Sequence, residues 1–92
     1  MTKREIFFTT QFKKDLKNAR KQNKDENKLW AVIENLANDE ILDEKLKDHN
    51  LSGNYSGYRE CHIFPDWLLI YKKEKDKLIL MLYRLGSHSD LF

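Results

Sequence analysis

The chain is poor in the residues that many binding and catalytic motifs require. Its 92 residues include one cysteine, one proline and three glycines, and no apolar run approaches the ~20 residues of a membrane-spanning helix. The single cysteine, Cys61, excludes an internal disulfide and agrees with a reducing compartment. The start of the chain, MTKREIFFTT, lacks the apolar segment of a secretory leader. We therefore expect a cytoplasmic protein without membrane contact.

Other motifs with defined chemistry are also missing. The glycines, at positions 53, 57 and 86, form no phosphate-cradling loop, and no nucleophile elbow is present. The histidines do not have the short spacing of zinc motifs; His62 and Asp66 are four residues apart, but across a strand-to-turn boundary. The sequence therefore predicts no metal and no cofactor.

The composition is that of a globular protein, with 40% hydrophobic and 35% charged residues. A chain of this length fits one domain, so residues 1–92 are expected to form a single domain.

The N-terminal half predicts a strand followed by two helices. Residues 4–8 have the β-branched and aromatic content of a strand. Thr9 or Thr10 can cap a first amphipathic helix, and Asn23 with Glu26 can form the capping box of a second. A short polar link between the two helices predicts a helical hairpin.

The C-terminal half predicts three strands, which are YRECHIF, WLLIYKK and KLILMLYRL. Turn signals separate them, so neighbouring strands must be antiparallel, because a parallel pair needs a long crossover. The predicted order is β-α-α-β-β-β. It describes an α+β domain in which an antiparallel sheet carries the helical hairpin on one face.

Charge is unevenly distributed along the chain. Residues 1–30 carry nine Lys/Arg and four acidic residues, whereas residues 31–50 carry two and six. A basic surface beside an acidic one can attract a polyanion such as RNA. Two solvated helix faces would give the same pattern, and charge alone leaves both interpretations open.

All three histidines, His49, His62 and His88, lie in the C-terminal half at loops or strand ends. In YRECHIF, the two-residue period places Glu60 and His62 on one face and Arg59 and Cys61 on the other. A single strand histidine is more often structural than catalytic, and Cys61 is expected in the core.

Two histidines and an arginine can perform metal-free acid–base chemistry on RNA, which supplies its own 2′-hydroxyl nucleophile. Such an enzyme needs a base, an acid, a cation for the phosphorane charge and an aromatic group to orient a nucleotide. The chain contains all four.

Several spaced blocks resemble the YafQ branch of the RelE/ParE toxin superfamily. They are the KDHNLSG segment, the GYRECH strand, the PDWLLIY turn and strand, and the ending RLGSHSDLF, which together span roughly residues 47–92. The resemblance implies a RelE-like fold and a toxin that cleaves messenger RNA on the ribosome. It also implies a cognate antitoxin, with a toxin that is monomeric alone and hetero-oligomeric with that antitoxin.

The resemblance also implies roles for individual positions. Base, acid or phosphate-stabilising roles fall on six residues, which are His49, Glu60, His62, Asp66, Arg84 and His88. Asp66 would orient a histidine or favour its charged form. Phe92, Trp67 and Arg59 would contact substrate, although packing is an equal alternative for Trp67. The basic segment would dock on ribosomal RNA through Lys13, Lys14, Lys17, Arg20, Lys21 and Lys24.

Two alternatives remain open at this point. A ParE-like toxin could poison a protein target such as gyrase without RNA chemistry, because fold does not fix function. A degenerate toxin could persist only as an antitoxin-binding partner. The set of histidines argues against both.

Overall fold

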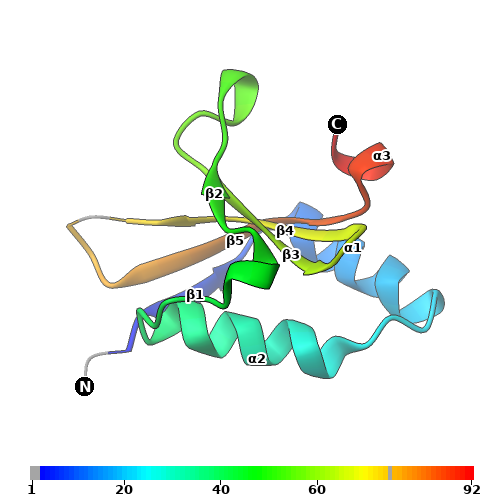
Figure 1. Cartoon of the computed structure of the whole chain (residues 1–92), viewed down its shortest axis with the longest axis horizontal. Helices are drawn as coiled ribbons and strands as arrows, with labels where there is room; N and C mark the ends of the chain where they lie inside the picture. Colours follow the sequence, from blue (N-terminus) through cyan, green and yellow to red (C-terminus); the bar gives the residue numbers. More distant parts are fainter. Residues whose placement is uncertain (1–2, 75) are drawn as a thin grey trace.

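The computed structural model describes residues 3–74 and 76–92 and confirms the predicted α+β class (Figure 1). A first strand is followed by a helical hairpin and then by the remaining strands. The elements are β1 (Glu5–Phe8), α1 (Thr10–Lys21), α2 (Glu26–Ala37), η1 (Glu44–Leu46), β2 (His49–Asn50), η2 (Gly53–Tyr55), β3 (Arg59–Phe64), β4 (Trp67–Lys73), β5 (Ile79–Gly86) and α3 (His88–Leu91). In the described residues, no helix is long and apolar enough to span a membrane.

Side-chain caps fix where the two long helices begin. Thr9 caps α1 by accepting a hydrogen bond from the backbone N–H of Phe12. The predicted capping box of the second helix does not form, because Asp25 is its N-cap and accepts from Asn27. Asn23 instead adopts a left-handed conformation, with φ of 57°, in the link between the helices.

The sheet has five strands in the order β1-β5-β4-β3-β2. The three predicted C-terminal strands are antiparallel as expected, and the short β2 extends the sheet beyond β3. The sheet is nevertheless mixed, because β1 pairs parallel to β5. These two strands are far apart in sequence, so no hairpin imposes an antiparallel direction, and the intervening chain supplies the crossover.

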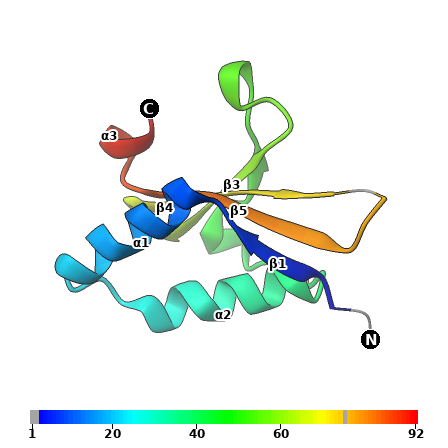
Figure 2. The same cartoon turned by 180° about the vertical axis from the view of Figure 1, so that it is seen from behind.

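The two faces of the sheet have different coverings (Figures 1 and 2). Helices α1 and α2 lie against one face and enclose the main core, which includes Cys61, Trp67 and Tyr71. The other face, here called the open face, carries a smaller cluster of Leu68, Ile70 and Leu91. The η2 loop and α3 rise from the open face on either side. The site described below lies between them.

Candidate functional site

Strand register brings residues from four strands into one row across the sheet. His49 of β2 pairs with Glu60 of β3, Glu60 pairs with Ile70 of β4, and Ile70 pairs with Arg84 of β5. Directly paired residues share a face, so His49, Glu60 and Arg84 lie on the open face. His62, two residues after Glu60, is on the same face, as the sequence predicted.

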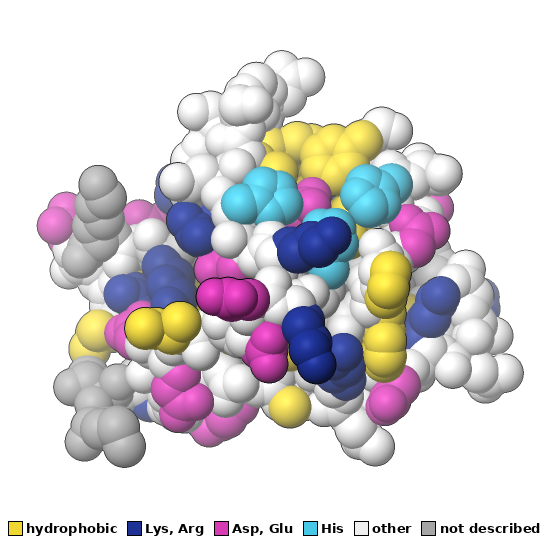
Figure 3. Space-filling view, viewed as in Figure 1, with side chains coloured by type: hydrophobic (Ala, Val, Ile, Leu, Met, Phe, Trp, Pro, Cys, Tyr) yellow, Lys and Arg dark blue, Asp and Glu magenta, His cyan; other side chains and the backbone are white. Residues whose placement is uncertain are grey.

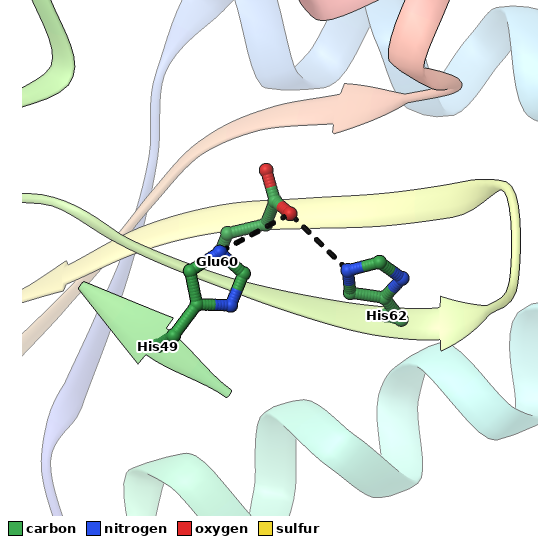
Figure 4. A group of neighbouring side chains, drawn as sticks. All are labelled: His49, Glu60 and His62. Carbon is green, nitrogen blue, oxygen red and sulfur yellow. Dashed lines mark ion pairs between the residues drawn. The ribbon is translucent and has the colours of Figure 1, made fainter. Parts of the chain in front are cut away.

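Glu60 lies between two histidines at the centre of this row (Figure 4). Its Oε1 is 3.3 Å from Nε2 of His62 and 3.7 Å from Nε2 of His49. The Glu60 side chain is only 5% exposed. A buried carboxylate needs charged or hydrogen-bonding partners, and here the partners are imidazoles.

The ring of His49 is held from its other side. Its Nδ1 lies 2.6 Å from the carbonyl oxygen of Lys47, so an Nδ1–H donates to that carbonyl. Lys47 has φ of 50°, and this left-handed turn directs its carbonyl back to the histidine. The turn therefore leaves Nε2 of His49 facing Glu60.

His88 is fixed by Asp66 at the opposite end of the site. Oδ1 of Asp66 is 3.1 Å from the backbone N–H of His88 and 3.0 Å from its Nδ1. Two hydrogen bonds from His88 hold the pKa of Asp66 below its usual range. The one from the backbone N–H has the larger effect and the one from the ring the smaller. This contact leaves Nε2 of His88 available to a substrate.

The last residues of the chain form a capped turn. Ser87 and Asp90 make a capping box at the start of α3, so Asp90 has a structural role that the sequence did not indicate. Leu91 is buried against Leu68 and Ile70, whereas Phe92 is 61% exposed. Removing residues 88–92 would therefore also uncover part of the open-face cluster.

The three histidines and Phe92 form a chain of neighbouring rings. Ring centroids are 6.2 Å apart for His49 and His62, 5.7 Å for His62 and His88, and 6.5 Å for His88 and Phe92. Tyr55 of η2 packs edge-on against Phe92 at 5.4 Å. Figure 3 shows all three histidines gathered on one face beside an apolar patch.

Arg84, in β5, is held by a carboxylate of α1. Its Nε and Nη2 donate to Asp15 at 3.0 and 3.1 Å, and the backbone N–H of Leu85 donates to the same carboxylate at 3.0 Å. Hydrogen bonding to Asp15 raises the pKa of Arg84 and keeps its charge fixed. The site thus contains imidazoles, carboxylates and a permanent cation.

Two expected substrate contacts face away from the histidines. Arg59 pairs with Tyr71 on the helix-covered face, where its guanidinium binds Asp48 and Asn50. Trp67 is 3% exposed within the main core. The Trp67 side chain therefore packs in the core, which was the alternative to a substrate contact.

The predicted ribosome-docking residues are exposed along α1 and the link after it. Arg20 is engaged with Glu26 at 2.9 Å. Lys21 and Lys24 border a hollow that also reaches Asp66 and Arg84. The basic segment thus approaches the site from the side of α1.

Sequence and structure comparisons identify the family. Residues 4–92 match the family described as the bacterial toxin of type II toxin–antitoxin system, YafQ. The chain belongs to the YafQ toxin family. The match favours the YafQ branch over the ParE-like alternative.

Individual YafQ relatives are similar over nearly their whole length. The mRNA interferase toxin YafQ of Escherichia coli is 45% identical, covering 100% of this chain and 99% of the relative. The crystal structure of the E. coli DinJ–YafQ toxin–antitoxin complex matches with a TM-score of 0.88 and 44% identity, covering 98% of both chains. A metal-bound toxin from Helicobacter pylori matches with a TM-score of 0.91 and 45% identity, covering 97% of this chain and 99% of that one.

Strands β2 and β3 also bring together a set of metal-ligand groups that sequence spacing did not reveal. One ligand atom each from His49, Glu60 and His62 lies within 4.8 Å of the others. Two imidazoles and a carboxylate are a donor set that zinc and copper accept. The ligands come together across β2 and β3, so their spacing along the chain resembles no zinc motif.

Sequence reasoning missed two residues that shape the site. Asp15 lies among Phe12, Leu16 and Ala19 on the buried face of α1, and a carboxylate on an apolar helix face indicates a buried partner. Tyr55, in contrast, lies in a polar loop without a regular pattern. No sequence signal indicated its contact with Phe92.

Proposed function

We propose that this chain is an mRNA interferase that cleaves messenger RNA on the ribosome and is neutralised by a cognate antitoxin. The observation that carries the proposal is the open-face row of His49, Glu60, His62 and Arg84, with His88 beside it. The E. coli relative, 45% identical, bears the name mRNA interferase toxin. Residues 1–92 act as one toxin domain, and its place of action is the cytoplasm, where ribosomes translate.

Cleavage uses the nucleophile that RNA carries. The cluster of His49, Glu60 and His62 accepts the proton of the 2′-hydroxyl, and the 2′-oxygen attacks the neighbouring phosphorus. Arg84 stabilises the negative charge that develops on the phosphorane oxygens. The bond from phosphorus to the 5′-oxygen then breaks.

His88 protonates the departing 5′-oxygen. Its Nδ1 is bound by Asp66, so Nε2 carries the transferred proton, and the carboxylate stabilises the imidazolium before transfer. The products are a 2′,3′-cyclic phosphate and a 5′-hydroxyl. The 2′-hydroxyl is the nucleophile, the histidines transfer the protons, and Arg84 stabilises the negative charge. The reaction therefore proceeds without a metal.

Phe92 positions the nucleotide. Its exposed ring lies beside His88 and is supported by Tyr55, so a base can stack on it. Base–aromatic stacking contributes about 1–3 kcal/mol per base. The basic residues of α1 and of the link after it bind ribosomal RNA and dock the toxin on the ribosome.

A cognate antitoxin is the second partner. The E. coli relative forms a toxin–antitoxin complex with DinJ, and its toxin chain is 44% identical to this one. We expect a monomeric toxin that becomes hetero-oligomeric when its own antitoxin binds. Co-expression of that antitoxin should restore growth to cells that are arrested by this chain.

The activity is tested in a purified translation system by primer extension on the message. We expect discrete cuts with the parent chain and none with His88→Ala at the same concentration. A gyrase supercoiling assay runs in parallel. Inhibited supercoiling with an intact message would refute RNA cleavage and support a protein target.

A further inference from the structure

A second hollow opens beside the histidines, on the side away from α1. It has a volume of about 430 Å³ and is bordered by η1, the start of α2 and the end of β3. We call it the lysine groove and define it by Lys28, Lys45, Lys47, Phe64, His62 and His88. The two histidines belong to the site already described, so the groove leads directly to the reacting groups.

The charged side chains that border the groove are positive, and none is acidic. Its three lysines come from separate segments, since Lys28 lies in α2, Lys45 in η1 and Lys47 directly after η1. No carboxylate lines it. Within residues 3–74 and 76–92, none of the three ammonium groups takes part in an ion pair. In Figure 3, basic side chains lie next to the histidines.

The hollow bordered by α1 has a different charge balance. Three cations line it, which are Lys21, Lys24 and Arg84, but so do three carboxylates, which are Asp15, Asp66 and Asp90. A polyanion gains less from such a mixed surface than from uncompensated lysines. The lysine groove is therefore the more favourable path for phosphates next to the site.

An aromatic ring gives the groove a second means of recognition. Phe64 stacks on the buried Trp67, with centroids 6.2 Å apart and an interplanar angle of 20°. Nζ of Lys28 lies 4.5 Å from the centroid of the Phe64 ring. Cations interleaved with aromatic rings are typical of surfaces that bind single-stranded nucleic acid.

Lys47 connects the groove to the acid–base cluster. Lys47 borders the groove, and its carbonyl accepts the Nδ1–H of His49. A phosphate bound by Lys47 would therefore lie close to His49, which is two residues further along the chain.

We propose that the lysine groove binds the messenger RNA strand adjacent to the scissile phosphate, with the lysines on phosphates and Phe64 against a base or ribose. The inference rests on the proposed function and adds a substrate subsite to it. The strand is that of the message, because the groove ends at His62 and His88. Ribosomal RNA offers the same phosphates, and the experiment separates these two sources.

The test compares Lys28→Gln/Lys45→Gln with Lys72→Gln/Lys77→Gln. The control removes the same charge near the opposite end of β4. Lys47 is left unchanged because its backbone holds His49. Binding to a 2′-O-methyl RNA oligonucleotide, which cannot be cleaved, is measured by fluorescence anisotropy at several salt concentrations.

We expect the groove variant to bind the oligonucleotide about tenfold more weakly. This factor follows if each of the two lysines contributes as much binding energy as an exposed ion pair. The slope of log K against log salt should fall by about 1.4, because each contact to a single strand contributes about 0.7. On programmed ribosomes, its half-saturating concentration should rise about tenfold, while its saturated cleavage rate stays within about twofold of the parent. The control should match the parent in every measurement.

Three results would overturn the inference. The first is an unchanged salt slope, or the same change in the control. The second is a slower saturated rate with unchanged half-saturation, which would place the lysines in the chemical step. The third is weaker binding to ribosomes without message, which would assign the groove to ribosomal RNA. Failure of the parent chain to cleave any message would instead refute the proposed function, and the oligonucleotide would still test the groove.

Discussion

The pair between Asp15 and Arg84 gives a quantitative prediction for replacing Asp15 with alanine. The carboxylate accepts from Nε and Nη2 of Arg84, from the backbone N–H of Leu85 and from Nε2 of Gln11. It is 7% exposed, whereas the Arg84 side chain is 22% exposed. The replacement thus affects one buried backbone donor and one partly hydrated cation.

The magnitude follows from these partners. Leaving the buried N–H of Leu85 without an acceptor costs about 1–3 kcal/mol. Losing the bonds to Arg84 adds a smaller amount, because water can reach the guanidinium. We expect Asp15→Ala to lower the free energy of unfolding by about 2–4 kcal/mol. Asp15→Asn should cost roughly half as much, since the amide oxygen can still accept from Leu85.

Urea unfolding followed by circular dichroism measures both variants. Glu40→Ala, at an exposed position, is the control and should stay within about 0.5 kcal/mol of the parent. In an Arg84→Gln background, the cost of Asp15→Ala should shrink by roughly 0.5–3 kcal/mol, which is the coupling of residues in contact. If Asp15→Ala and Glu40→Ala unfold at the same urea concentration, Asp15 does not hold β5 and Arg84 as described.

Three further predictions concern the site. Phe92→Ala should raise the half-saturating toxin concentration for message cleavage by about 5–150-fold, which is equivalent to the loss of one stacked base. Its unfolding in urea should not change, and unimpaired cleavage would exclude a stacking role. Zinc or copper should inhibit cleavage by occupying the cluster of His49, Glu60 and His62, and EDTA should restore full activity; inactivation of the pure toxin by EDTA alone would instead require a catalytic metal. Asp66 should titrate below its usual range in an NMR pH titration and keep part of that shift in His88→Ala, because the backbone N–H remains. The lowered pKa of Asp66 stabilises the fold at pH values above the ordinary pKa of a carboxyl group, and this stabilisation is lost as the pH falls through the lowered pKa. A titration midpoint of Asp66 at the ordinary carboxyl value would contradict its hydrogen bonds with His88.

Much of the fold could be predicted because its signals are local. Alternation in RECHIF fixed which side chains face the helices, and the structure places Cys61 in the core and His62 on the open face. Tight turns fixed the antiparallel order of β3, β4 and β5. The parallel pairing of β1 could not be predicted in this way, because it depends on a partner more than 70 residues away.

The site was predictable in its members but not in its geometry. The resemblance supplied the histidines, Glu60 and Asp66, whereas strand register alone brings His49 opposite Glu60. Arg59 and Trp67 show the limit of such transfer, because their backbone positions place both side chains on the helix-covered face. The lysine groove also depends on tertiary structure, since Lys28 near the start of α2 and Lys45 in η1 are far apart in the sequence.

The chemistry of the cut ends shows whether the 2′-oxygen of the message is the nucleophile. A message cleaved by this chain on purified ribosomes should carry a 2′,3′-cyclic phosphate upstream of the cut and a 5′-hydroxyl downstream, as read by mass spectrometry of the fragments. A message with 2′-deoxy substitution at the cut nucleotide should remain intact. Fragments that end in a 3′-hydroxyl and a 5′-phosphate, or cleavage of the deoxy-substituted message, would contradict attack by the 2′-oxygen.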